Sequence, residues 1–171
     1  MKNNKRSNGI HKNYMKKGFT LIEILIVVAI IAILASVVLV GLGPTQRAGR
    51  DARRIADLRT IQNGLELYYN KCGYYPGPTN AAACAAWATT NFSGMSSALT
   101  GSTLGITAVP NDPSAGKTYY FGSYTNGSTY TLGAVLEDGN NAVFNNYTAP
   151  PNVPTGLTSC TKANSEYCVT L

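Results

Sequence analysis

The longest apolar run in the sequence, Phe19 to Val40, covers 22 residues and contains one charged side chain, Glu23. A helix of this length measures roughly 33 Å at about 1.5 Å per residue, close to the thickness of the hydrocarbon core of a bilayer. The apolar core of a secretory signal is shorter, roughly 7–15 residues, and ends in a cleavage site of small residues. Ala35-Ser36 is a poor version of such a site, and apolar residues follow it. The run therefore predicts a membrane-spanning helix.

The net charge of +6 belongs to the N-terminal tail. Residues 1–18 hold six Lys/Arg and no acid, whereas the other 153 residues hold eight Lys/Arg and eight Asp/Glu. This separation argues against a nucleic-acid partner and favours a cytoplasmic tail under the positive-inside rule. Charge alone does not set the orientation, because five arginines follow the run on its other side. These are Arg47, Arg50, Arg53, Arg54 and Arg59.

Residues 43–71 predict a second, amphipathic half of the helix. Gly41, Gly43 and Pro44 weaken the hydrogen-bond ladder, so we expect a break or kink between the halves. Beyond it, apolar residues recur at spacings of three and four, and Gly73 suits a left-handed cap. The predicted apolar stripe consists of Ala48, Ala52, Ile55, Leu58, Ile61, Leu65 and Tyr68.

Residues 72–171 predict a globular head. Residues 77–116 show no sustained period and suggest a long connecting loop, with one or two helical turns at 81–88 and Trp87 against the core. Asn126-Gly127 lies between two β-rich runs, which predicts a hairpin because both turn residues must adopt positive φ.

The rest of the head completes an α+β prediction. Asp138-Gly139 suggests a second turn and residues 142–147 a third strand, so the antiparallel sheet would cover about 117–147. The tail after Pro150 is expected to be a loop. In this prediction the amphipathic half of the long helix packs on the small sheet.

Four cysteines follow the apolar run, at Cys72, Cys84, Cys160 and Cys168. The absence of a C-x-x-C pair argues against a zinc site, and an even number in a translocated domain suggests disulfides. Loop length favours Cys72–Cys84 and Cys160–Cys168, while four free thiols are the alternative.

The head offers little for catalysis. The one histidine, His11, lies in the tail, so no His-based triad can form in the head. Glu137, Asp138 and Asn140 supply hard oxygen ligands that could bind calcium, although a polar hairpin turn is the simpler interpretation. No phosphate-binding loop is present in the sequence, and we expect no other cofactor.

The stretch "KKGFTLIEILIVVAIIAILA" resembles the N-terminus of type IV pilins and of type II secretion pseudopilins. A basic leader is followed by Gly18, Phe19 and an apolar helix with glutamate at its fifth position, Glu23. Residues 50–76 resemble the amphipathic continuation of that helix in weaker form. "VPNDP" followed by "YTLGAVLED" resembles the sheet region of major pseudopilins.

The resemblance implies a processed filament subunit rather than an enzyme. A prepilin peptidase would remove residues 1–18 by cutting between Gly18 and Phe19 on the cytoplasmic side, and would methylate the new amine of Phe19. Residues 19–42 would first span the inner membrane. An assembly platform would then move the subunit into a helical homo-oligomer outside the cytoplasm, with the long helices at its centre.

Two relatives within this resemblance stay open, a surface pilin and a major pseudopilin of type II secretion. Pseudopilins commonly carry a calcium loop and usually lack cysteines, so the four cysteines favour a pilin. Outside the family, a membrane-anchored enzyme or adhesin that does not polymerise is the remaining alternative. Adhesion, motility, DNA uptake and secretion all stay open as roles.

Glu23 admits two interpretations. Thr20-Leu-Ile-Glu23 fits a capping box, in which the carboxylate helps to start its own helix. Alternatively, Glu23 pairs in the filament with the Phe19 amine of a neighbouring subunit, a cation at neutral pH. An unpaired charge among apolar helices is costly, since breaking a buried pair typically costs about 3–5 kcal/mol. We favour this pairing, which would set the axial offset between helices while the capping box also operates.

Overall fold

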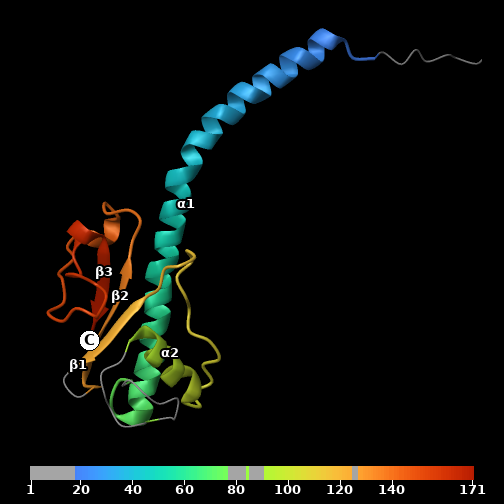
Figure 1. Ribbon diagram of the computed structural model, residues 1–171. Coiled ribbons are helices and arrows are strands. Elements are labelled where there is room, and N and C mark those ends of the chain that lie inside the picture. The colour runs from blue at the N-terminus through green and yellow to red at the C-terminus, as the bar shows by residue number, and fades with distance from the viewer. Residues whose placement is uncertain (1–17, 77–83, 85–90, 125–126) are drawn as a thin grey trace, which may run out of the picture. The chain divides into compact units, whose positions relative to one another are not determined.

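The computed structural model describes residues 18–76, 84, 91–124 and 127–171. The chain divides into two compact units, Met1–Gly41 and Leu42–Leu171. Its architecture is α+β and pilin-like, with a long helix, a shorter helix and a small antiparallel sheet, which confirms the predicted class (Figure 1).

The first unit contributes the apolar part of helix α1, which runs from Leu21 to Cys72. Its segment Leu21–Val38 has a mean hydropathy of 3.1 and, by length and composition, is able to cross a membrane. The hydroxyl of Ser36 donates to the carbonyl of Ile33 at 2.7 Å, so this polar group is satisfied within the helix. Such internal satisfaction is what an apolar environment requires of a helix.

Helix α1 continues through Gly41, Gly43 and Pro44, with Pro44 inside the helix, so no break divides its two halves. The predicted kink at these residues stays a prediction. A proline removes one backbone donor, and the hydrogen bonds on either side of it can carry the helix onward.

The second half of α1 packs against the head through one face. Leu58, Ile61, Leu65 and Tyr68 are buried at spacings of three and four, as predicted. The start of the predicted stripe is wrong, because Ala48 and Ala52 are exposed and Ile55 is only half-buried.

The helix ends as its sequence predicts. Cys72 is its last residue, and Gly73 adopts a φ of +77° while its amide donates to the carbonyl of Tyr69 at 2.7 Å. A left-handed glycine after the last turn is a common helix C-cap, because it lacks the Cβ that disfavours this conformation.

Helix α2, Phe92–Gly101, lies within the segment that we predicted as a connecting loop, so that part of the prediction is wrong. The side chain of Asn91 caps it by accepting from the amide of Gly94 at 3.0 Å. Phe92, Met95 and Leu99 are buried in the head core. The turns predicted at 81–88, with Trp87, lie outside the described residues except for Cys84.

The sheet contains β1 (Tyr120–Tyr124), β2 (Thr129–Val135) and β3 (Glu166–Thr170) in the order β1-β2-β3, all antiparallel. Strands β1 and β2 form the predicted hairpin, with Tyr124 opposite Thr129. Asn126 of the predicted turn lies outside the described residues, and Gly127 has a φ of +81°.

The predicted third strand at 142–147 is wrong. A short 3-10 helix, η2 (Ala142–Phe144), occupies this segment because the side chain of Asn141 accepts from the amide of Val143 at 3.0 Å. The third strand comes instead from the C-terminal tail, which we predicted as a loop. A second 3-10 helix, η3 (Lys162–Asn164), precedes it.

Strand β3 lies at one edge of the sheet, and a tyrosine covers part of that edge. The hydroxyl of Tyr147 accepts from the amide of Cys168 at 3.0 Å and donates to the carbonyl of the same residue at 3.2 Å. The ring of Tyr147 also packs against Tyr167, with centroids 5.4 Å apart. One side chain thus satisfies both backbone groups that Cys168 presents at this edge.

The head core joins α1, α2 and the sheet. Tyrosines supply much of it: Tyr75 meets Tyr130 edge to face at 4.6 Å between centroids, and Phe92 meets Tyr119 at 5.7 Å. The amide of Tyr75 donates to the carbonyl of Gly127 at 2.7 Å, which ties the segment after α1 to the hairpin turn.

Candidate functional site

The junction between Gly18 and Phe19 lies in a non-helical, exposed segment just before α1 begins at Leu21. Phe19 is 84% exposed. A Cβ built on Gly18 would meet no atom within 4 Å, so contacts within this structure do not require glycine there. The junction is therefore accessible to a protease.

The capping box at the start of α1 is present in the structure. The amide and the hydroxyl of Thr20 each donate to Oε2 of Glu23 at 2.7 Å, and the amide of Glu23 donates to the hydroxyl of Thr20 at 3.3 Å. Both bonds to the carboxylate use the same oxygen. Among the described residues none is bonded to Oε1, so capping leaves one oxygen of Glu23 for a further partner.

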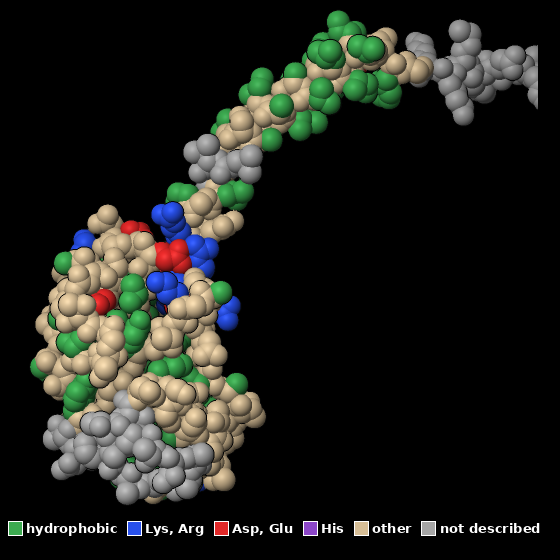
Figure 2. Space-filling model, viewed as in Figure 1, with side chains coloured by type: hydrophobic (Ala, Val, Ile, Leu, Met, Phe, Trp, Pro, Cys, Tyr) green, Lys and Arg blue, Asp and Glu red, His purple; other side chains and the backbone are tan. Residues whose placement is uncertain are grey.

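The apolar side chains of the first half of α1 have no partner within the described chain. None of the window Leu21–Val38 is buried. Figure 2 shows its hydrophobic side chains on the helix surface. Exposure of this extent marks a surface that lipid or protein covers.

A cluster of charged residues lies in the head and is centred on a buried arginine, Arg54, which is 1% exposed. Its guanidinium meets the carboxylate of Asp112 through two bonds, Nε to Oδ2 at 2.8 Å and Nη2 to Oδ1 at 2.9 Å. Nη1 donates to Asp51 at 2.7 Å and to Glu137 at 2.9 Å, and Nη2 donates to Ser114 at 2.8 Å. All five N–H groups of Arg54 are thus used.

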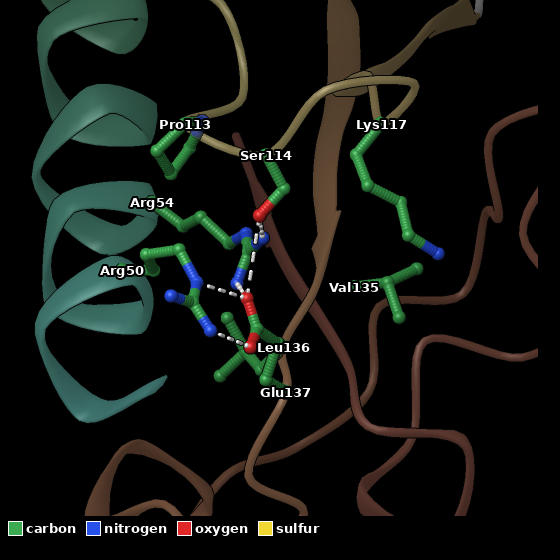
Figure 3. Close-up of a pocket in the computed structure, with 8 residues that line it drawn as sticks. All are labelled: Arg50, Arg54, Pro113, Ser114, Lys117, Val135, Leu136 and Glu137. Carbon is green, nitrogen blue, oxygen red and sulfur yellow. Dashed lines mark hydrogen bonds and ion pairs between the residues drawn. The ribbon is translucent and has the colours of Figure 1, made fainter. Parts of the chain in front are cut away.

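Asp51 holds the chain that follows β2. It is fully buried, and its carboxylate accepts the amide of Glu137 at 2.9 Å and that of Asp138 at 2.9 Å. Arg50 makes a bidentate contact with Glu137: its Nε donates to Oε1 at 2.7 Å and its Nη2 donates to Oε2 at 2.5 Å. Figure 3 shows Arg50 and Arg54 extending from α1 towards Glu137, beside a cavity of about 420 Å³.

The charges in this cluster stabilise one another. Hydrogen bonds from Arg50, supported by Arg54, lower the pKa of Glu137 from 4.5 to about 2, although burial opposes the shift. Burial raises the pKa of Asp112, but the bonds from Arg54 and the amide of Ser114 outweigh it, so that pKa is lowered. The bonds to Asp112 and then to Asp51 and Glu137 raise the pKa of Arg54, against the effect of burial. Glu137, Asp112 and Arg54 therefore all remain ionised near neutral pH.

Our sequence reasoning missed this cluster, although the spacing carried a signal. Asp51 and Arg54 precede Leu58, Ile61 and Leu65 at spacings of three and four, so both lie on the face that packs into the head. Charged residues on a buried face require partners. Asp112, 58 residues away along the chain from Arg54, was not identifiable from that pattern.

The carboxylates of two of the three residues considered for calcium take part in hydrogen bonds within the head. Glu137 is bonded to two arginines, and Oδ1 of Asp138 accepts the amide of Asn140 at 2.8 Å. The part of the chain that the structure describes contains no group of three or more His, Cys, Asp or Glu side chains suited to a metal.

Two disulfides join the cysteines in the pairing that loop length favoured. Cys72 and Cys84 have Cα atoms 5.1 Å apart, and Cys160 and Cys168 have Cα atoms 5.6 Å apart. Glu166 supports the second loop, since its carboxylate accepts the amides of Thr158, Ser159 and Cys160, each at 2.8 Å. Burial raises the pKa of Glu166, but these three bonds outweigh it and the pKa is lowered.

Comparison with known proteins identifies a family motif in the N-terminal segment. A family model described as "Prokaryotic N-terminal methylation motif" matches residues 13–39. The chain is 33% identical over 61 residues to type II secretion system core protein G of Escherichia coli (strain K12), a match that covers 36% of this chain and 42% of that protein. It is 34% identical over 64 residues to the protein of the same name from Pectobacterium carotovorum subsp. carotovorum, covering 37% and 40%.

These matches span about two fifths of the length of both relatives. No solved structure matches the chain significantly. The matched motif contains the accessible Gly18–Phe19 junction, Glu23 and the uncovered apolar helix. The chain thus carries a prokaryotic N-terminal methylation motif and is similar, over about two fifths of their length, to two proteins named type II secretion system core protein G.

Proposed function

We propose that the protein is a structural subunit, a pilin, of a type IV pilus-like surface filament and has no catalytic activity of its own. One observation carries the proposal: the methylation motif coincides with a helix half whose apolar side chains find no partner within the described chain. Such a surface suits lipid first and a bundle of identical helices later.

Processing is the first step of this proposal. A prepilin peptidase cuts between Gly18 and Phe19 and methylates the new amine of Phe19. The exposed, non-helical junction supports this step, because a protease needs an extended and accessible segment. Since packing within the structure does not require glycine at position 18, we assign that requirement to the peptidase.

Pairing of Glu23 with the Phe19 amine of a neighbouring subunit is the second step. Oε2 of Glu23 is used by Thr20, whereas Oε1 is not bonded within the described chain. Capping and pairing can therefore operate together. The pair would compensate both charges in an apolar filament core and would fix the offset between subunits.

The head lies outside the cytoplasm in this proposal, with the basic tail inside and an inner-membrane assembly platform moving the subunit into the filament. The arginines that follow the apolar run do not oppose this orientation, because they belong to the second unit, Leu42–Leu171, and long domains translocate largely regardless of their charge.

A major pseudopilin of a type II secretion system is the second candidate function. The similarity to two proteins named type II secretion system core protein G favours it. The two disulfides favour the pilin. A fibre seen by electron microscopy on cells that lack the secretion genes, labelled by an antibody to the head, would favour the pilin, whereas loss of exoprotein secretion on deletion would favour the pseudopilin.

Two measurements test the proposal as a whole. The intact mass of the purified protein should show a chain that begins at Phe19 with a methyl group on its amine. A Glu23→Gln variant should be cleaved and inserted in the membrane but should form no filaments. An intact leader, or cleavage elsewhere, would exclude both filament functions and leave a membrane-anchored enzyme or adhesin. Filaments of normal length from Glu23→Gln would contradict the pairing.

A further inference from the structure

A cavity of about 380 Å³ lies within the second unit, where α2 and β1 meet. It is lined by residues 91–93 at the start of α2, residues 118–121 that lead into β1, and Thr155. The two elements lie side by side here (Figure 1), with the rings of Phe92 and Tyr119 in contact. The volume lies within the roughly 300–1,000 Å³ typical of small-molecule sites. The function proposed above makes no use of this cavity.

One aromatic side chain of the lining is accessible to a ligand. Phe92, Tyr119 and Phe121 are buried in the head core, whereas Tyr120 is only half-buried. The ring of Tyr120 lies against the backbone of Gly156, where an added Cβ would come within 2.7 Å of its Cε1. Gly156 also has a φ of +100°, a conformation that favours glycine. The glycine next to Thr155 thus holds the Tyr120 ring close to the loop that contributes to the cavity.

Several lining residues carry hydroxyl groups that a ligand can use. Ser93 and Thr155 are exposed, and no hydrogen bond joins either side chain, or the phenol of Tyr120, to another described residue. The hydroxyl of Thr118 donates to the carbonyl of Tyr119 at 3.2 Å and keeps its capacity to accept. None of the described lining residues is charged, so the lining does not compensate a charge on a ligand. The cavity therefore suits an uncharged ligand with an apolar face and several hydroxyls.

We propose that this cavity binds a neutral pyranose residue of a glycan. A pyranose ring has a face of C–H groups that packs on an aromatic side chain, here Tyr120. Its hydroxyls both donate and accept hydrogen bonds, as do those of Ser93 and Thr155. A linear polyol has similar hydroxyls but no fixed apolar face, and a charged ligand would lose hydration without gaining a counter-ion. The inference is independent of filament formation, because the lining residues all belong to the unit Leu42–Leu171.

Saturation-transfer NMR of the full chain, in a zwitterionic detergent without a sugar headgroup, tests this inference. The probes are methyl β-glucopyranoside, methyl β-galactopyranoside and methyl N-acetyl-β-glucosaminide, with sorbitol as the open-chain control. We expect saturation to pass from the protein to at least one of the pyranosides and not to sorbitol. Titration of that pyranoside gives its Kd. Tyr120→Ala should raise this Kd about tenfold, since it removes the ring on which the sugar packs.

A second variant and two matched controls separate binding from folding. Thr155→Ala removes an exposed hydroxyl that is not bonded within the described chain, so the head should fold unchanged while the Kd rises about threefold. Thr107→Ala is its control, because Thr107 is an exposed threonine that does not line the cavity. Tyr69→Ala is the control for Tyr120→Ala, since Tyr69 is an exposed tyrosine outside the cavity. Both controls should bind the pyranoside as the unaltered chain does.

Three outcomes would overturn the inference. The first is the absence of saturation transfer to all three pyranosides, and the second is equal transfer to sorbitol. The third is a Kd that neither Tyr120→Ala nor Thr155→Ala raises. The filament function is tested separately, by the mass of the processed chain and by imaging of Glu23→Gln, so either proposal can fail without the other.

Discussion

Arg54 and Asp112 are joined by two parallel hydrogen bonds of 2.8 and 2.9 Å, although 58 residues separate them in the sequence. The pair connects α1 to the loop that precedes β1. Glu137 is bonded to the same guanidinium and so connects the segment after β2 to α1 as well. One buried side chain thus fixes two loops of the head against the long helix.

Removal of Arg54 should therefore destabilise the head strongly. Arg54→Ala leaves Asp51 and Asp112 buried without their cation, and the loss of one partner from a buried pair typically costs about 3–5 kcal/mol. Urea unfolding of the full chain in detergent, followed by tyrosine fluorescence, measures the effect.

Arg53→Ala is the control for that experiment. Arg53 is the adjacent residue, but its side chain is 64% exposed and its contact with Asp57 is 3.7 Å long. We expect a change below about 0.5 kcal/mol, as for most surface substitutions. If both variants lose the same stability, the buried cluster does not stabilise the head.

Stability should fall in acid as Glu137 takes up a proton. Bonds from Arg50 and Arg54 lower its pKa from 4.5 to about 2 in the folded chain, so its contribution is fully present above pH 4.5 and is lost as the pH falls towards 2. Asp112 and Glu166, whose pKa values are also lowered, act in the same direction. Urea unfolding at successive pH values measures the loss.

Glu137→Gln separates this residue from the other carboxylates. Glutamine does not titrate, so the variant should be less stable near neutral pH but should lose less stability between pH 4.5 and 2 than the unaltered chain. Parallel stability curves for the two proteins across this range would contradict the assignment.

Calcium should have little effect on the head. The carboxylate of Glu137 is already neutralised by two arginines, and a cation would have to displace them. We expect the same melting temperature with a millimolar excess of calcium and with a chelator. A rise in melting temperature with calcium that Asp138→Asn abolishes would show a calcium site at the turn after β2.

The two disulfides predict a defined peptide map. Trypsin cuts after Lys71, Lys117 and Lys162, so Cys160–Cys168 should link peptide 118–162 to peptide 163–171 without reduction. Peptide 72–117 should be lighter by two hydrogens, because it contains both Cys72 and Cys84. A link between peptide 72–117 and either of the others would contradict this pairing.

Thr20→Val should separate the two uses of Glu23. The variant removes the hydroxyl that bonds to Glu23 but leaves the carboxylate in place. The start of α1 should be weakened by about 1 kcal/mol, the usual cost of a lost cap. Filaments should still form, unlike those of Glu23→Gln. If neither variant forms filaments, imaged by negative-stain electron microscopy, capping rather than pairing explains the requirement for Glu23.

The features that the sequence predicts well are local. The apolar run, the cap at Gly73 and the hairpin around Gly127 each depend on residues that lie close together in the chain. Loop length likewise favoured the disulfide pairing that the structure forms. At the site, the Gly18–Phe19 junction and the Thr20–Glu23 capping box were identifiable for the same reason.

The features that the sequence did not predict depend on distant partners. Residues 142–147 have strand-like composition, but the side chain of Asn141 favours a 3-10 turn there. Strand β3 forms because β2 has a free edge, with Gly133 opposite Cys168. The Arg54 cluster joins α1 to loops far along the chain. Periodicity reports which face is buried, not which remote residue covers it.

The phenol of Tyr147 has a consequence for how copies of this protein can associate. An uncovered strand edge invites addition of strands from other molecules, which leads to disordered aggregates. At Cys168 the hydroxyl of Tyr147 takes the place of such a strand. A protein that polymerises through a helix must keep its sheet from competing for the same neighbours. In the filament proposed above, Tyr147 would protect ordered growth at this edge by making a rival mode of association unfavourable.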